Sequence, residues 1–217
     1  MYDLEKAITE RRSTRMFLSD KAVPTELVEE ALNLAMRAPS NSNIQPWHLV
    51  LASGQARDRL VEALLEVAQV ESPNVPVLPE AFAHMRHDLG ALVYGSMGIA
   101  RDDAEARRNA VLRNWEFFRA PLAGIVCMHR DLDDVDAMGV GMFLQTLLLA
   151  LTARGLGTCV QVSIAGYPDV VREQLNIGDD MRILCGLAIG YPDPAFGAND
   201  LRVPRNPVEQ NVVFVDR

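Results

Sequence analysis

The chain has 217 residues, of which 49% are hydrophobic and 23% charged, and its formal net charge is −8. This composition is typical of a globular protein with a sizeable core, and the acidic balance argues against nucleic acid or an anionic membrane as the main partner. Cys127, Cys159 and Cys185 lie far apart in apolar runs, so we expect buried thiols in a reducing compartment.

The N-terminal half is predicted to be mainly helical. A short helix over 2–12 is followed by a turn at 20–23, and Pro24 begins a second helix whose apolar positions run to Ala38. Residues 47–53 form a predicted strand and 55–69 a predicted helix. The segment 71–80 contains three prolines and is predicted to be a loop. Further helices are expected at 81–95 and 103–118.

The C-terminal half alternates strands and helices. We predict a buried strand at 121–128 and an apolar helix at 135–153, whose longest apolar stretch, 138–153, is short of a bilayer span. The segment at 155–168 is predicted to be first strand-like and then irregular. A helix at 169–175 and a strand at 182–192 follow. The tail, 193–217, ends in "NVVFVD", which forms a strand only if it joins a sheet. We expect one domain over 1–217 and, without a signal peptide, a cytoplasmic protein.

Two basic groups stand out in this acidic chain. "RRSTR" (11–15) contains Arg11, Arg12 and Arg15, whose guanidinium forks suit phosphate oxygens, and Ser13 adds a hydroxyl donor. The residues alone also allow a solvated helix end. A second group near the end of the chain, "NDLRVPRNP", is equally ambiguous. Neither "GVGMFL" nor "GLGTCV" leads from a strand into a helix, so a phosphate would be held by side chains and not by a glycine-rich loop.

The remaining reactive residues do not form a recognisable catalytic or metal site. His84 and His87 are three residues apart on a predicted helix, but no further ligand joins them at metal-binding spacing, so no metal site is predicted. There is no nucleophile elbow and no cysteine beside a histidine. The aromatic residues Trp115, Phe117 and Phe118 either pack in the core or line a pocket, and the core is expected because an aromatic stripe on a helix usually packs inward.

The stretch "APSNSNIQPW" (38–47) stops a helix with a run of small polar residues. Pro39 cannot continue the helix, and the serines and asparagines that follow compete with the backbone for hydrogen bonds. The turn contains more amide groups than its own hydrogen bonds require. We therefore expect these amides to face a ligand, water or another chain.

Five motifs occur in order across essentially the whole chain: "RRSTRMF", "APSNSNIQPWHLV", a Gly-Leu-Gly segment before an irregular turn, "GLAIGYPD" and "NDLRVPRNPVE". Together they resemble the FMN-dependent nitroreductase family. The resemblance implies an α+β fold, in which helices sandwich a mixed, mostly antiparallel sheet. It also implies an intertwined homodimer in which the C-terminal strand crosses to the partner's sheet.

The resemblance further implies a noncovalently bound FMN. Arg11 and Arg205 would bind its phosphate, Ser13 a polar oxygen, and Arg15 the pyrimidine edge, where its charge would stabilise the reduced ring. The turn after Pro39 would approach the flavin from the partner subunit, and the turn at 163–166 would lie near flavin N5. Many members carry an acidic residue where this turn has Ala165. The full set of implied cofactor-binding residues is Arg11, Arg12, Ser13, Arg15, Pro39, Ser40, Asn41, Asn43, Gln45, Asn114, Ile164, Ala165, Gly166, Arg202 and Arg205.

The implied reaction has two halves at one flavin. NADH or NADPH reduces FMN, and a small-molecule acceptor such as a nitroaromatic compound or a quinone then oxidises it, with no side chain acting as acid or base. Three alternatives remain open at this point. They are another flavin enzyme on the same scaffold (a dehalogenase, a flavin-fragmenting enzyme or an azoline dehydrogenase), a non-enzymatic FMN carrier or sensor, and a helical interaction module without flavin.

Overall fold

A four-stranded sheet forms the centre of the computed structural model, which describes residues 4–215. Its order is β1-β2-β4-β3, and all three pairings are antiparallel. Within the described residues the parallel component is one isolated bridge between Ser13 and Thr158. The predicted α+β arrangement is confirmed. The strands are β1 (His48–Ser53), β2 (Leu122–His129), β3 (Gly157–Gln161) and β4 (Met181–Gly190).

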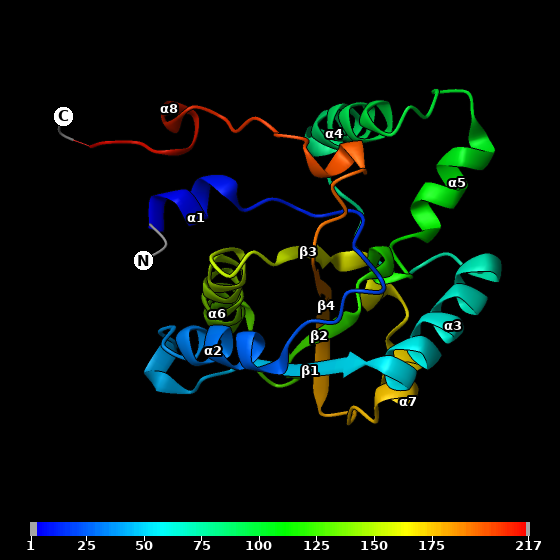
Figure 1. Cartoon of the computed structure of the whole chain (residues 1–217). Coiled ribbons are helices and arrows are strands. Elements are labelled where there is room, and N and C mark those ends of the chain that lie inside the picture. The colour runs from blue at the N-terminus through cyan, green and yellow to red at the C-terminus, as the bar shows by residue number, and fades with distance from the viewer. Residues whose placement is uncertain (1–3, 216–217) are drawn as a thin grey trace.

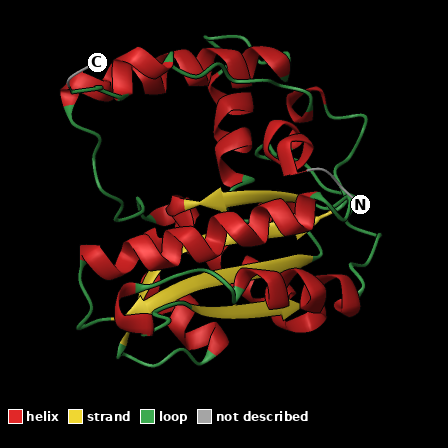
Figure 2. Cartoon of the chain, turned by 90° about the vertical axis from the view of Figure 1, so that its left-hand side faces the viewer, coloured by secondary structure: helices red, strands yellow, loops and turns green. Residues whose placement is uncertain are grey.

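Helices cover both faces of the sheet. Helices α2 and α6 lie on one face and α3 and α7 on the other, while α4 lies beyond the edge strand β3 (Figure 1). Figure 2 shows the same layers after a turn of 90°. The helices are α1 (Leu4–Glu10), α2 (Thr25–Ala35), α3 (Gly54–Val70), α4 (Ala83–Ser96), α5 (Ala104–Leu112), α6 (Asp134–Thr152), α7 (Pro168–Leu175) and α8 (Val208–Asn211).

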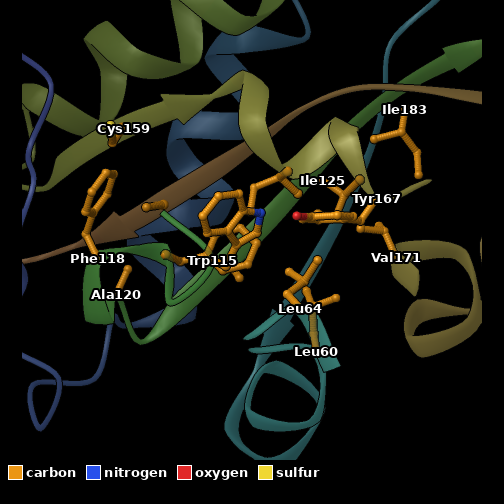
Figure 3. Close-up of a cluster of buried hydrophobic side chains, with 14 of the residues drawn as sticks. Leu60, Leu64, Trp115, Phe118, Ala120, Ile125, Cys159, Tyr167, Val171 and Ile183 are labelled. Carbon is orange, nitrogen blue, oxygen red and sulfur yellow. The ribbon is translucent and has the colours of Figure 1, made fainter. Parts of the chain in front are cut away.

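The sheet separates two buried hydrophobic clusters. Strand β2 contributes side chains to both clusters, because alternate residues of a strand point to opposite faces of the sheet. Ile125 and Cys127 point to the α3/α7 side, and Val126 and Met128 point to the α2/α6 side. In the first cluster the Trp115 ring lies 5.8 Å from that of Tyr167 (Figure 3). All three cysteines are free and buried, as their apolar surroundings predict.

Helix α6 is a core element of this fold. By length and apolar composition it is the one helix within residues 4–215 that could cross a membrane. Seven of its residues are nevertheless buried inside the protein, among them Phe143, which stacks on Trp47 at 5.1 Å. Asp133 and Asp136 form a capping box at its start. The helix therefore fills the space between α2 and the sheet.

The predicted helix over 103–118 is wrong in its second half. Helix α5 ends at Leu112, and Phe117, Phe118 and Arg119 all adopt positive φ. Trp115, Phe117 and Phe118 are all buried. A continuous helix would place Trp115 and Phe117 about 200° apart, on opposite faces. The chain breaks the helix instead, and this break brings all three rings into the core.

Two other segments differ from the sequence-based expectation. Helix α2 ends at Ala35, so Ala38 lies in the turn beyond it. In the tail, the short helix α8 was not predicted, and residues 212–215 pair with no strand within the described part of the chain. The apolar residues there are largely exposed in the single chain, Val213 by 85% and Val215 by 81%. Pairing of this segment with a partner's sheet stays a prediction.

The segment 11–17, which we call the arginine strap, lies along the end of the sheet. The Thr14 N–H donates to the Thr158 carbonyl (2.9 Å), and the Phe17 N–H donates to the Phe118 carbonyl (3.1 Å). The close approach requires glycine at position 157, because a Cβ there would lie 2.5 Å from Thr14 Oγ1.

Asn199 fixes the strap from the other side. Its side chain is 2% exposed; Oδ1 accepts from the Arg15 N–H (2.7 Å), and Nδ2 donates to the carbonyls of Met16 (2.8 Å) and Asp193 (2.9 Å). The strap and the turn at 197–199 are therefore held together by one buried amide.

We predict that Asn199→Ala destabilises the protein by about 1–3 kcal/mol, because it leaves buried backbone groups without partners. Urea unfolding followed by circular dichroism measures this difference. Asn33→Ala, at an exposed position on α2, is the control and should change stability by no more than about 0.5 kcal/mol. Equal effects of the two substitutions would contradict the role of Asn199.

Candidate functional site

A cavity of about 1090 Å³ lies between α4, α5 and the C-terminal end of β3. Of the residues implied by the sequence, Arg15 and Asn114 line it. His87 lines it as well, whereas His84 on the same helix does not; both histidines are exposed. Apolar side chains such as Val93, Met97 and Val111 form part of the wall. A space of this size and mixed character suits a small organic ligand.

Three residues of the arginine strap influence the thiol of Cys159, which is buried in β3. Burial raises the pKa of the Cys159 thiol to about 11, while the positive charge of Arg15, a hydrogen bond from Ser13 and the charge of Arg11 act in the opposite direction. These three residues therefore lie close enough to β3 to influence the same thiol, and their role as an anion-binding group stays a prediction. Two guanidinium groups and a hydroxyl at one place form a favourable site for phosphate oxygens.

Arg12, from the same motif, is used differently. Its Nε donates to the Asn199 carbonyl, and a terminal nitrogen donates to the Glu10 carbonyl at 3.3 Å. Both contacts tie the strap to the rest of the fold. In this arrangement, the Arg12 side chain supports the strap while its neighbours on either side converge on Cys159.

Gln161 was missed by the sequence analysis. It is 3% exposed at the end of β3 and lines the cavity, and its Nε2 donates to the Asn114 carbonyl at 2.6 Å. Within residues 4–215, its Oε1 is buried without a hydrogen-bond partner, and so is the hydroxyl of Ser163 in the next turn. A polar residue among the apolar residues of "TCVQVSI" was the available signal, since a buried amide needs partners.

The turn after β3 lines the cavity with residues that come earlier in the sequence than those the resemblance implies. Val162 and Ser163 line the cavity, whereas Ile164 is fully buried against Gly186 and Gly166 packs against Pro73. Ala165 is partly buried against the α3/α7 cluster. None of the described contacts brings the side chains of residues 164–166 to the cavity wall.

The turn at 38–47 lies at the start of α6, where Gly139 contacts Ser40 and Pro46. Ser40 Oγ accepts from the Gln45 N–H (3.0 Å), and the Gln45 amide donates to the Asn43 carbonyl (3.3 Å). Asn43 and Gln45 hold positive φ, a conformation that costs free energy in residues other than glycine. Within residues 4–215, Pro39, Ser40, Asn41, Asn43 and Gln45 do not line the cavity of their own chain.

The two C-terminal arginines lie on the extended segment after the turn at 197–199. Arg202 is exposed, and the exposed Arg205 donates to the carbonyls of Val203 (2.9 Å) and Pro204 (3.1 Å). Neither residue lines the cavity in the described chain. The structure therefore does not join this second basic group to the strap.

The residues at the cavity fit a flavin mononucleotide. The strap provides cationic groups for one phosphate, and the buried oxygens of Gln161 and Ser163 lack hydrogen-bond partners beside the cavity. A ring system with polar edges can use such groups, whereas a purely apolar ligand would leave them unpaired. The residues that fit FMN belong to the strap and to the end of β3. The turn at 38–47 contributes none of them within its own chain.

Comparison with known proteins places these features in a family. Residues 8–191 match the family model described as "Nitroreductase family". The structure superposes on the FMN-dependent nitroreductase NfnB from Mycobacterium smegmatis in complex with NADPH with a TM-score of 0.90, at 34% identity and over 97% of each chain.

Two further relatives match nearly their full length. The FMN and NADPH-dependent nitroreductase NfnB from sphigopyxis sp. strain HMH gives a TM-score of 0.94 at 30% identity, over 99% of this chain and 100% of that one. The 4-nitrobenzoate reductase of Pseudomonas putida is 34% identical over 209 residues, which is 94% of this chain and 91% of that protein. The present chain therefore belongs to the nitroreductase family.

Proposed function

We propose that this protein is an FMN-dependent oxidoreductase that uses NADPH or NADH to reduce nitroaromatic compounds and related acceptors. The observation that carries this proposal is the convergence of Arg11, Ser13 and Arg15 beside a cavity that contains unpaired buried polar groups. Relatives named for FMN, for NADPH and for nitroaromatic substrates support it. A cytoplasmic location and a single domain remain predictions.

Bound FMN would supply the centre that accepts and returns the hydride. The protein's residues would bind and orient it. Arg11 and Ser13 would contact the phosphate and a polar oxygen, and the Arg15 guanidinium, whose terminal nitrogen donates to the Ser13 carbonyl (3.2 Å), would stabilise negative charge on the reduced ring. The mixed wall of α4 and α5 would exclude water and receive the nicotinamide and the acceptor in turn. Use of one cavity by both substrates leads to ping-pong kinetics.

We also propose that the site is completed by a second copy of the chain. The polar turn at 38–47 and the strap both carry groups suited to a flavin, yet the turn packs at the start of α6 and does not line the cavity of its own chain. The exposed apolar tail gives a second reason, since exposed apolar backbone of this kind favours pairing with another chain. In the homodimer, the turn and Arg205 of each chain would reach the partner's flavin.

The proposed function is tested with purified protein reconstituted with FMN. We expect a yellow protein that releases FMN, and not FAD, on heating. Under anaerobic conditions NADPH or NADH should bleach the flavin in a stopped-flow experiment, and a nitroaromatic compound should restore its colour. Free FMN at the same concentration is the control. Oxidation of the nucleotide no faster than by free FMN would indicate a carrier or sensor and would reject the proposal.

Arg11→Ala and Arg205→Ala should each weaken FMN binding. Each removes a charge-assisted contact worth about 1.5–3 kcal/mol, which corresponds to a roughly 10- to 150-fold higher Kd. Quenching of flavin fluorescence during titration of the apoprotein measures the Kd. Arg59→Ala, at an exposed position on α3, serves as the control and should bind like the wild type. Unchanged affinity in both test variants would show that the phosphate lies elsewhere.

Removal of residues 207–217 should leave a protein that is monomeric or aggregated and poor in FMN, because the exchanged segment would no longer bind the partner. Sedimentation velocity and the flavin-to-protein absorbance ratio measure these properties. The milder double substitution Val213→Lys and Val215→Lys leaves the chain at full length and should also shift the equilibrium toward monomer. A soluble monomer with full FMN content and turnover would place the whole site within one chain.

A further inference from the structure

The cavity carries a charge opposite to that of the protein. Five arginines line it, together with one histidine, whereas no aspartate or glutamate of the described chain belongs to its lining. The full sequence has 29 acidic and 21 basic residues, so this concentration of positive charge is local. The arginines are Arg15, Arg86, Arg101, Arg107 and Arg113.

Two of these guanidinium groups are positioned by aromatic rings. Arg107 lies over the ring of Tyr94 at 4.3 Å, and Arg113 lies over the ring of Phe196 at 5.5 Å. Stacking uses the flat face of a guanidinium and leaves N–H groups at its edge available to a ligand. The arrangement therefore holds two charges beside the cavity without consuming all their donors.

In the described part of the chain, Arg86 and Arg101 carry no carboxylate partner. Among the ion pairs of residues 4–215, none involves either side chain. Of the neighbouring acidic residues, Asp103 accepts from the Ala106 N–H at the start of α5, and Asp88 lies 3.4 Å from His87. Uncompensated arginines beside an apolar wall attract an anion more strongly than a neutral molecule.

We propose that this arginine-lined part of the cavity binds an oxyanionic group on a substrate, so that the enzyme favours substrates carrying a carboxylate or phosphate over matched neutral ones. The inference rests on the proposed function and adds the charge class of the substrate. Leu89, Val93 and Val111 provide apolar surface in the same cavity. An aromatic acceptor with a carboxylate, or the 2′-phosphate of NADPH, would supply the oxyanion.

The two sources are separated by matched substrate pairs in steady-state assays of the holoenzyme. The first pair is 4-nitrobenzoate and 4-nitrobenzamide, which carry the same nitro group but differ in charge. The second pair is NADPH and NADH. The double variant Arg86→Gln, Arg101→Gln removes the two unpaired charges, and Arg108→Gln is the control because Arg108 is exposed on α5 and does not line the cavity.

We expect the KM of the wild type for the charged member of at least one pair to be about tenfold lower than for the neutral or less charged member, as one charge-assisted contact provides. The double variant should abolish this ratio, while Arg108→Gln should retain it. If the double variant loses the KM ratio in the acceptor pair, the bound oxyanion is the carboxylate of the acceptor. If it loses the KM ratio in the nucleotide pair, the bound oxyanion is the 2′-phosphate of NADPH.

A binding measurement separates recognition from turnover. Benzoate and benzamide are titrated into the oxidised holoenzyme, and the change in the flavin absorbance spectrum reports binding. Benzoate should bind more tightly in the wild type than in the double variant, and its advantage should shrink in high salt because Arg86 and Arg101 are exposed. Benzamide binding should be the same in both proteins.

The proposal is overturned if charged and neutral members of both pairs are used equally by the wild type, or if the double variant keeps the same ratios. Failure of the proposed function looks different, because neither 4-nitrobenzoate nor 4-nitrobenzamide would then be reduced at all.

Discussion

The attachment of the arginine strap to the end of the sheet is the constraint on which the site depends. Several arginines repel one another, so an acidic chain must use structure to hold them together. Here, backbone hydrogen bonds to β3, the buried amide of Asn199 and the missing Cβ of Gly157 supply that structure. The free energy of folding thus offsets the cost of gathering like charges before any ligand binds.

Neighbouring residues of the strap have different roles. Because it runs extended beside β3, successive side chains point to opposite sides. Thr14 faces Gly157 and is fully buried, while Ser13 and Arg15 on either side of it reach the surroundings of Cys159. Arg12 in turn binds backbone carbonyls. One five-residue motif therefore contains both the ligand-facing groups and the groups that anchor them.

Much of the architecture follows from local patterns. The buried strands β2 and β4 and the apolar helix α6 were predictable because most residues of each element are apolar. The break after α5 was not, because local periodicity does not show that Trp115, Phe117 and Phe118 must all reach one core. The structure of the tail could not be predicted from a local pattern either. A segment forms an edge strand only when a neighbouring strand is available to pair with it.

The site was predicted less completely than the fold. The strap was identified from residue chemistry and resemblance; Arg11, Ser13 and Arg15 all influence the thiol of Cys159 in β3, while their binding of FMN stays a prediction. Gln161 and Asn199 were missed because each has its role through contacts with distant segments, Asn114 in one case and the strap in the other. The arginines of the cavity wall come from the strap, from α4, from α5 and from the segments on either side of α5, so their proximity is a product of the tertiary structure.

Helix α4 contributes several residues to the cavity, yet none of its residues is buried in the single chain. Exposed positions tolerate substitution with small changes in stability, commonly within about 0.5 kcal/mol. The wall of the cavity can therefore diverge between homologues while the sheet and the strap stay intact. Separation of the stabilising core from the residues that meet the substrate makes this fold well suited to acquiring new substrates by successive point mutations.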